Sequence, residues 1–551
     1  MMGKMRFEST NIAAENIKKI AELSPGVVTE GKVNFDLLRS LLGDEVFGDE
    51  AYEFTWVGKR AAIAEAGKPI RKTLRPCVEE SRNWDITENL YIEGDNLDVL
   101  KLLRESYLGK VKMIYIDPPY NTGNDFVYRD NFAQDKGEYD EEAGIYDEDG
   151  DRLVRNIKSN GRFHSDWCSM MYSRLVLARN LLRNDGVIFI SIDDNEVAQL
   201  RKICEEIFGE SNFVAEVVWE RAFAPVNLMK HFSRSHDYII CYAKSIDELI
   251  CNGLRRTEET DGRYQNPDND PRGPWSSSDI SVGPAVQANI YPITTPSGRV
   301  VEPPTGRSWS LSEKAFSERL QDNRIWFGAD GNGVPRIKRF KSDLRKQGIT
   351  PMTIWKYADV GHSQDATKDL KTLFDGDNLF DYPKPVELIK QMLVLFTDKD
   401  STILDFFSGS STTAHAVMKL NSEDLTVGQA DYGNRKFIMV QLPEPCAPDS
   451  EAGKAGYKNI CEIGKERIRR AGEKIKADNA GKEGIDDLDI GFRVLKLDDT
   501  NMKDVYYAAG EYNQDLLALM EDNIKEDRTD MDLLYACLLD WGLPLSMPHT
   551  Q

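Results

Sequence analysis

Short apolar runs alternate with amphipathic segments over much of the chain. The predicted buried strands are 90–92, 111–116, 187–192, 402–405 and 437–440. Segments with helical spacing at 97–106, 167–182 and 412–420 separate them. Strands joined by helices of this length indicate right-handed crossovers and a mostly parallel sheet, so the expected fold class is α/β.

The alternation stops between 246 and 350. Proline and glycine cluster there, interleaved with tryptophans at positions 275, 309 and 326. A long loop-rich insertion that still carries tryptophans is typical of an ordered recognition module and not of a linker. The strand and helix pattern then returns, so the insertion divides one sheet into two halves.

Composition and charge narrow the class of protein. The 551 residues carry a net charge of −22, which argues against a protein that coats nucleic acid without specificity. No apolar stretch approaches the roughly 20 residues that span a bilayer, and the N-terminus lacks an apolar signal core, so we expect a cytoplasmic protein with no membrane segment. The eight cysteines form no C-x-x-C pair, and we expect no metal site.

The middle of the chain escapes the acidic bias. From 215 to 356 there are 20 Lys plus Arg against 17 Asp plus Glu. A basic run lies at 336–346, where six cations accompany one acid, Asp343. Taken alone, this run fits a solvated helix face as well as a phosphate contact.

The first candidate for chemistry is Asp117-Pro118-Pro119-Tyr120, directly after the strand 111–116. Open α/β sheets bind ligands at the carboxyl ends of their strands. Two prolines stiffen the turn and remove two backbone donors. A carboxylate, a free Pro118 carbonyl and an aromatic plane suit the binding of an exocyclic amino group, although a proline turn that merely ends a buried strand has the same sequence.

The second candidate is a tight turn of small residues between the strand 402–405 and the helix 412–420. Gly409 and its serine neighbours allow close approach of a ligand, and the helix start favours an anionic group. Gln441 and Glu444 follow the next strand, where the ribose of a nucleoside cofactor would lie.

Three motifs together resemble a known family. They are D-P-P-Y, then Lys384-Pro385 in K-P-x-x-L, then Asp405 to Ser410 in D-x-F-x-G-S. In this order they are similar to the β class of DNA amino-methyltransferases, and in particular to the Mod subunits of Type III restriction-modification systems. The similarity extends from about 85 to 500. It implies a Rossmann-like S-adenosylmethionine-dependent sheet with permuted motif order, and methyl transfer to adenine N6 within a short DNA sequence.

The resemblance also implies roles for individual residues. The expected catalytic residues are Asp117, Pro118, Pro119 and Tyr120. The expected cofactor-binding residues are Asp405, Phe407, Gly409, Ser411, Asp95, Lys384, Pro385, Gln441 and Glu444. Ser411 stands where the family has glycine, and Asp95 fits an N-cap of the next helix equally well.

The resemblance further implies binding of double-stranded DNA with flipping of the target base, a homodimer, and a separate restriction (Res) subunit. Two alternatives stay open: a cytosine-N4 methyltransferase, whose substrate presents nearly the same amino group, and a DNA-binding specificity subunit without catalysis. The expected domains are a mostly helical region at 1–84, a catalytic half at 85–245, a target-recognition domain at 246–375, a cofactor-binding half at 376–478, and a small, shortened C-terminal α/β module at 479–551.

Overall fold

The computed structural model describes residues 9, 11–24, 27–29, 32–35, 38, 53–123, 126–128, 145–146, 152–155, 161–225, 229–344, 348–424, 433–503 and 523–549. These residues form two compact units, 1–251 with 352–551 and 252–351. Part of the region expected to be mostly helical, 1–84, lies outside the described residues. None of the described helices is long and apolar enough to cross a membrane.

The larger unit is built on a ten-stranded sheet. Its strands, in spatial order, are β19 (Ile354–Trp355), β10 (Phe213–Glu220), β11 (His236–Ala243), β9 (Leu182–Ile192), β5 (Val111–Ile116), β20 (Thr402–Asp405), β21 (Lys436–Gln441), β4 (Leu90–Glu93), β22 (Phe492–Asp499) and β3 (Lys72–Arg82). The six central strands from β9 to β22 run parallel. The expected α/β sheet is therefore confirmed, and every residue of β5 is buried, as its apolar sequence predicts.

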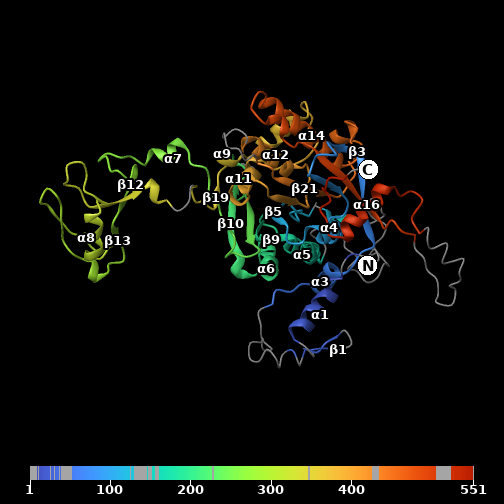
Figure 1. Cartoon of the computed structure of the whole chain (residues 1–551), viewed down its shortest axis with the longest axis horizontal. Helices are drawn as coiled ribbons and strands as arrows, with labels where there is room; N and C mark the ends of the chain where they lie inside the picture. The colour runs from blue at the N-terminus through green and yellow to red at the C-terminus, as the bar shows by residue number, and fades with distance from the viewer. Residues whose placement is uncertain are drawn as a thin grey trace. The chain divides into compact units, whose positions relative to one another are not determined.

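Helices cover both faces of this sheet (Figure 1). One layer contains α3 (Lys59–Gly67), α4 (Asn96–Tyr107), α5 (Phe163–Leu181), α6 (Val197–Phe208) and α16 (Asp530–Asp540). The other contains α9 (Tyr357–Val360), α10 (Ser363–Leu373), α11 (Val386–Phe396), α12 (Thr412–Asp424) and α14 (Ile460–Asp478). Because helices bury the sheet on both sides, ligands reach it only at the strand ends.

The remaining elements of the larger unit are short or peripheral. They are α1 (Ile12–Leu23), β1 (Val28–Thr29), β2 (Lys32–Val33), β6 (Phe126–Tyr128), β7 (Ile145–Tyr146), β8 (Arg152–Arg155), α13 (Glu451–Lys454), and the 3-10 helices η1 (Glu210–Asn212) and η5 (Ile485–Asp487). α1 lies in the region 1–84, which was expected to be mostly helical.

Both ends of the chain contribute to the main sheet, which the sequence did not predict. β3 lies within the region expected to be mostly helical, and it pairs antiparallel with β22. β22 in turn pairs parallel with β4, so the segment expected as a separate C-terminal module belongs to the larger unit. β3 is an edge strand with a polar sequence, and such strands carry little hydrophobic periodicity.

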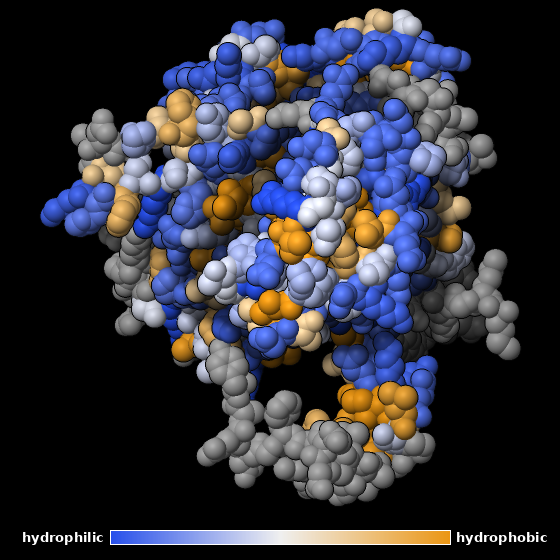
Figure 2. Space-filling view, turned by 90° about the vertical axis from the view of Figure 1, so that its left-hand side faces the viewer, coloured by the Kyte–Doolittle hydropathy of each residue, from blue (hydrophilic) through white to orange (hydrophobic). Residues whose placement is uncertain are grey.

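The smaller unit spans 252–351 and has its own core around Trp309, Tyr291 and Phe327. Its elements are α7 (Glu258–Gly262), β12 (Trp275–Asp279), β13 (Ser281–Val282), η2 (Gln287–Asn289), β14 (Ile293–Thr294), β15 (Val300–Val301), β16 (Ser308–Trp309), α8 (Glu313–Gln321), β17 (Ile325–Trp326), β18 (Arg336–Phe340) and η3 (Lys341–Asp343). The unit is shorter than the expected 246–375 domain, because β19, α9 and α10 belong to the larger unit. The face seen in Figure 2 is mainly hydrophilic, with apolar residues in small groups.

The basic run at 336–346 begins as a strand and not as a helix. Along β18, Arg336 and Arg339 are exposed whereas Lys338 is buried against Asp270, at 3.4 Å, and Asp268. The side chains of Arg336 and Arg339 hydrogen-bond serines of β12 instead of carboxylates. The two arginines are three positions apart, so the period of two along a strand sends their exposed guanidinium groups to opposite faces of β18.

Candidate active site

The two motif turns meet because their strands are neighbours. β5 and β20 are parallel, with Met113 opposite Ile403 and Ile114 opposite Leu404. Asp117 follows the end of β5, and the small-residue turn at 406–411 follows the end of β20. Since the carboxyl ends of adjacent parallel strands lie at one edge of the sheet, the two turns form one site.

The D-P-P-Y turn is held by hydrogen bonds to residues of two helices. Trp167 of α5, a fully buried residue, donates its indole N–H to the Pro119 carbonyl over 2.7 Å. Asn121 has a φ of 59° and donates to Glu196, the N-cap residue of α6, over 2.5 Å. These contacts fix the turn on both sides of Tyr120. Among the described residues, no donor reaches the Pro118 carbonyl, which leaves that oxygen available as an acceptor.

Asp117 is paired with a lysine from the other half of the chain. Its Oδ2 lies 2.5 Å from Nζ of Lys384, and its Oδ1 is buried without a hydrogen-bond partner among the described residues. The same ammonium lies 5.1 Å from the centroid of the Tyr120 ring. The Tyr120 hydroxyl is also buried without a partner, and burial, followed by the negative charge of Asp117, raises its pKa well above the usual range. Tyr120 is therefore an uncharged ring beside a carboxylate.

Two further carboxyl groups lie within electrostatic reach of this pair. Burial raises the pKa of Asp405 to about 7, hydrogen bonds from Thr413 and Phe407 oppose the rise, and the charge of Asp117 adds to it. Burial likewise raises the pKa of Asp237 in β11 to about 6, opposed by the charges of Arg221 and Lys384. Three carboxyl groups thus share the positive charge of Lys384.

Asp405 organises the turn that follows β20. Its Oδ1 accepts the Phe407 N–H at 3.1 Å, and its Oδ2 accepts the Thr413 hydroxyl at 2.6 Å. Gly409 and Ser411 adopt φ values of 50° and 62°, so the position where the family has glycine does require the left-handed conformation, and serine adopts it here. The turn is therefore fixed by its own strand and by the first turn of α12.

Helix α14 approaches this turn closely at Gly464. A Cβ at Gly464 would lie 2.7 Å from Oγ of Ser411 and 2.8 Å from the hydroxyl of Tyr91. The Tyr91 hydroxyl is buried and has no hydrogen-bond partner among the described residues. The absence of a side chain at Gly464 thus lets α14 support the turn from behind.

These residues fit a sulfonium cofactor with an amino-acid tail. The N–H groups of the first turn of α12 have no intrahelical acceptors, and they favour a carboxylate near Thr412. Gly409 permits close approach of a ligand, and the Phe407 ring supplies an apolar wall that is 8% exposed. The carboxyl groups of Asp405 and Asp117 place negative charge on the side where a cation would be held.

The remaining expected cofactor residues have partners that define their roles. Asp95 is the N-cap of α4, accepting the Leu97 N–H at 2.8 Å, and it also faces Arg174 at 3.4 Å. Gln441 accepts the Gly409 N–H at 2.6 Å and donates to the Leu442 carbonyl, so both ends of its amide hold protein groups.

Three expected cofactor residues remain. Pro385 is the N-cap residue of α11, directly after Lys384. Glu444 lies beyond the end of β21 and is partly exposed. Lys384 contacts the D-P-P-Y turn and not the turn after β20.

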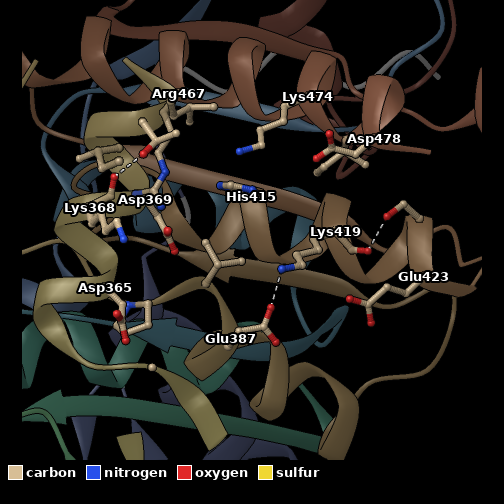
Figure 3. A pocket seen from close by; sticks show the side chains of 18 of the residues that line it. Asp365, Lys368, Asp369, Glu387, His415, Lys419, Glu423, Arg467, Lys474 and Asp478 are labelled. Carbon is tan, nitrogen blue, oxygen red and sulfur yellow. Dashed lines mark hydrogen bonds and ion pairs between the residues drawn. The ribbon is translucent and has the colours of Figure 1, made fainter. Parts of the chain in front are cut away.

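A cavity of about 690 Å³ lies beside the turn after β20, between α10, α11, α12 and α14 (Figure 3). Arg467 of α14 lines it and is 2% exposed, and its Nη1 donates to the Ser410 and Thr412 hydroxyls at 2.6 Å each. The side chains of Lys419 and Lys474 point into the cavity from α12 and α14, and Lys419 pairs with Glu387 at 2.5 Å. Arg467 therefore links this cavity to the turn after β20.

The sequence did not point to several residues that shape the site. Trp167 and Arg174 are buried in a helix whose spacing predicted only core packing. Glu196 is the N-cap residue of α6, and Asp237 lies in β11. The only feature of the sequence that could have indicated a role for Asp237 is its charge at the start of an apolar run. Among the described residues, no cluster of three or more His, Cys, Asp or Glu is placed to hold a metal.

Comparison with known proteins defines the class to which this site belongs. A family model described as DNA methylase matches residues 111–469, which include the D-P-P-Y turn, the smaller unit and the turn after β20. The chain therefore belongs to the DNA methylase family, and the resemblance expected from its motifs is confirmed.

Within this family the chain is similar to Mod subunits of Type III restriction-modification enzymes. It is 38% identical over 451 residues to the StyLTI Mod subunit of Salmonella typhimurium, covering 80% of this chain and 65% of that protein. It is 34% identical to the EcoPI Mod subunit of Escherichia phage P1, covering 85% and 75%. It is 32% identical to the EcoP15I Mod subunit of Escherichia coli, covering 84% and 73%. The match thus spans slightly less than two thirds of the first of these relatives.

Proposed function

We propose that this chain transfers a methyl group from S-adenosylmethionine to adenine N6 within a short DNA sequence, as the modification subunit of a Type III system. The observation that carries the proposal is the adjacency of β5 and β20, which puts the D-P-P-Y turn beside the turn that fits the cofactor. Membership of the DNA methylase family supports the same reading. The proposal includes double-stranded DNA and a separate Res subunit as partners, and a homodimer as the assembly.

The proposed chemistry depends on positioning. Bound S-adenosylmethionine supplies a methyl group activated by a sulfonium. The amino nitrogen of adenine is a poor nucleophile because its lone pair is delocalised into the ring. Accepting its two N–H bonds at Asp117 and at the Pro118 carbonyl favours a more tetrahedral nitrogen whose lone pair is localised.

The charge on Asp117 also opposes the positive charge that develops on the nitrogen. Because the nitrogen becomes acidic once it is cationic, its proton leaves without a strong base. Asp117 therefore contributes by position and charge.

Tyr120 supports an extrahelical base. A base inside a duplex cannot reach a carboxylate at the end of a buried strand, so the proposal requires flipping of the target nucleotide. An uncharged tyrosine ring offers a stacking surface that replaces the lost neighbours, worth about 1–3 kcal/mol for base–aromatic contacts in general. The contacts of Trp167 and Glu196 hold this ring in place before DNA arrives.

The smaller unit is the proposed target-recognition domain. It lies between the two motif halves in the sequence and has its own core, so its loops can vary without changing the sheet. Its strand β18 presents Arg336 and Arg339, and both side chains hydrogen-bond serines. Neither forms an ion pair with a carboxylate of the described residues. Guanidinium groups of this kind suit phosphate or base contacts.

Methylation-sensitive long-read sequencing tests the proposal. DNA would come from cells that express the chain and from cells that express Asp117→Ala. We expect N6-methyladenine in one short motif, present with the wild-type chain and absent with the variant. Methylation at cytosine N4 would favour the alternative substrate. DNA without any modified base, from a chain shown to be folded and to bind DNA, would favour the non-catalytic specificity subunit and contradict the proposal.

A further inference from the structure

Lys384 occupies the position that the proposed mechanism gives to the target amine. Its Nζ lies 2.5 Å from Oδ2 of Asp117 and 5.1 Å from the centroid of the Tyr120 ring. The lysine side chain is 11% exposed, so this ammonium belongs to the site and not to the surface. A nitrogen that donates to Asp117 while facing Tyr120 is what an adenine amino group would present there.

We propose that Lys384 is the resident occupant of the target-amine subsite, and that the flipped base binds by displacing it. This inference rests on the proposed function, because it takes Asp117 and Tyr120 as the groups that hold the base. The carboxylate oxygen bonded to Nζ cannot accept the amino N–H in the same direction at the same time. Since Oδ1 is buried, an entering amino group meets the carboxylate at Oδ2, so entry of the base requires the ammonium to leave that oxygen.

The charges around the site explain why a lysine stands there. Asp117 lies at the end of a fully buried strand, and its Oδ1 already lacks a hydrogen-bond partner among the described residues. Asp405 is 2% and Asp237 7% exposed, and both act electrostatically on the same lysine. Without Lys384, the negative charge of Asp117 would lie among carboxyl groups with no cation in contact, which is costly in a partly buried site.

The same neighbours allow the exchange. Lysine is a compact charge on a flexible four-carbon stem. When a neutral base replaces the ammonium at Asp117, the displaced charge stays within reach of Asp237 and Asp405. The lysine therefore exchanges its ion pair with Asp117 for an interaction with Asp237 and Asp405.

A displacement step also selects the base. To replace the ammonium, the entering base must donate N–H bonds to Asp117 and stack on Tyr120. Adenine and cytosine carry such an amino group, whereas the thymine carbonyl would face the carboxylate with an acceptor. Lys384 thus acts as a specificity-determining residue, because a base that lacks an amino group cannot replace its ammonium at Asp117.

The test compares Lys384→Met with the wild-type chain on a duplex that carries the sequenced motif with adenine at the target position and 2-aminopurine as its neighbour, where loss of stacking on the flipped adenine raises the fluorescence. Methionine keeps the length of the stem and removes the charge. We expect the variant to show more 2-aminopurine fluorescence and about tenfold tighter binding of this duplex, because no ion pair must be broken. Lys384→Arg keeps the charge and is expected to bind as the wild type does.

Lys112→Met is the matched control. Lys112 lies at the other end of β5, is 4% exposed and pairs with Asp185 at 2.9 Å. Asp185 retains Arg183 at 2.9 Å, so removal of Lys112 does not leave that carboxylate alone. This variant is expected to leave base flipping and DNA affinity unchanged. Where Lys384→Met does not fold, Lys384→Gln replaces it.

Two outcomes would overturn the inference. Unchanged or lower fluorescence and affinity in both uncharged Lys384 variants would mean that the base does not compete with the ammonium. Loss of S-adenosylmethionine affinity with unchanged base flipping would instead assign Lys384 to the cofactor. If either result is found and the wild-type chain still methylates its motif, only this inference is refuted. If the wild-type chain methylates no DNA, the proposed function is refuted.

Discussion

The indole N–H of Trp167 donates to the carbonyl of Pro119 over 2.7 Å, and this bond joins helix α5 to the D-P-P-Y turn. Trp167 is fully buried, so the bond is shielded from water. Because Pro119 immediately precedes Tyr120, the orientation of the tyrosine ring depends on helix α5. The turn is thus held by the core of the larger unit.

Replacing Trp167 with phenylalanine tests this dependence. The variant loses one buried hydrogen bond, and we expect a loss of about 1 kcal/mol in the free energy of unfolding. Methylation is expected to fall about tenfold, because small displacements of positioning groups are costly in rate. The matched control is Trp219→Phe, which removes an indole bond to the Gly361 carbonyl at 3.0 Å. Equal losses of methylation in both variants would contradict the special role of Trp167.

Replacing Asp117 with asparagine tests the acceptor role of its carboxylate. Asparagine keeps the shape and removes the charge that opposes the developing cation. We expect methylation to fall about 10²–10³-fold while binding of DNA persists. Asp85→Asn, at an exposed carboxylate, is the control. Single-turnover methylation rates and DNA binding would be measured together, and full methylation by Asp117→Asn would refute the assignment.

Replacing Gly464 with alanine tests whether α14 supports the turn after β20. The new Cβ would press on Ser411 and Tyr91, so we expect weaker binding of S-adenosylmethionine, by about tenfold, in calorimetry. Gly472→Ala is the control from the same helix. Its Cβ would lie 2.8 Å from Cβ of Ile490, remote from the turn. Both variants are expected to lose stability, and only the first should lose cofactor affinity.

The two exposed arginines of β18 predict a salt-dependent contact with DNA. In Arg336→Ala/Arg339→Ala the slope of log affinity against log salt should fall by about 2, if each guanidinium neutralises one phosphate. Arg319→Ala, on the exposed side of α8, is the control. The two slopes would be measured by fluorescence anisotropy between low and physiological salt. An unchanged slope in the double variant would remove β18 from the DNA-binding surface.

Asp237 predicts a pH dependence of stability. Burial raises the pKa of its carboxyl group from 3.8 to about 6, so the folded protein keeps a proton that the unfolded chain releases near pH 4. The stability contributed by that proton is therefore lost as the pH rises from about 4 through 6. Relative to Asp237→Asn, the wild-type chain should lose up to about 3 kcal/mol between pH 4 and pH 8. Denaturant unfolding of both proteins across this range would check it, and parallel curves would contradict it.

The sequence predicted the centre of the sheet because its strands contain long apolar runs. β5 and β9 are buried, and their runs have no competing interpretation. It did not predict β3, whose lysines, arginines and glutamates suit an edge strand that is only partly covered. Edge pairing is decided by the partner strand β22, more than 400 residues away, and local pattern carries no trace of it.

The candidate site shows the same division. Asp117 and the turn at 405–411 were predicted, because strand ends and small-residue turns leave a local signature. The pairing of Lys384 with Asp117 was not, since the two residues are 267 positions apart and meet only through the order of strands. Gln441 illustrates the converse: its position suggested a ribose contact, whereas its amide holds the backbone of Gly409.

The adjacency of β5 and β20 has a consequence during synthesis of the chain. A ribosome has already released Asp117 when residues 252–351 emerge, yet the neighbour strand of β5 that carries the second turn does not exist until residue 405 is made. Until then one side of β5 has unpaired backbone groups. A nascent polypeptide interrupted before that point contains the D-P-P-Y turn without the turn of small residues that completes the proposed site.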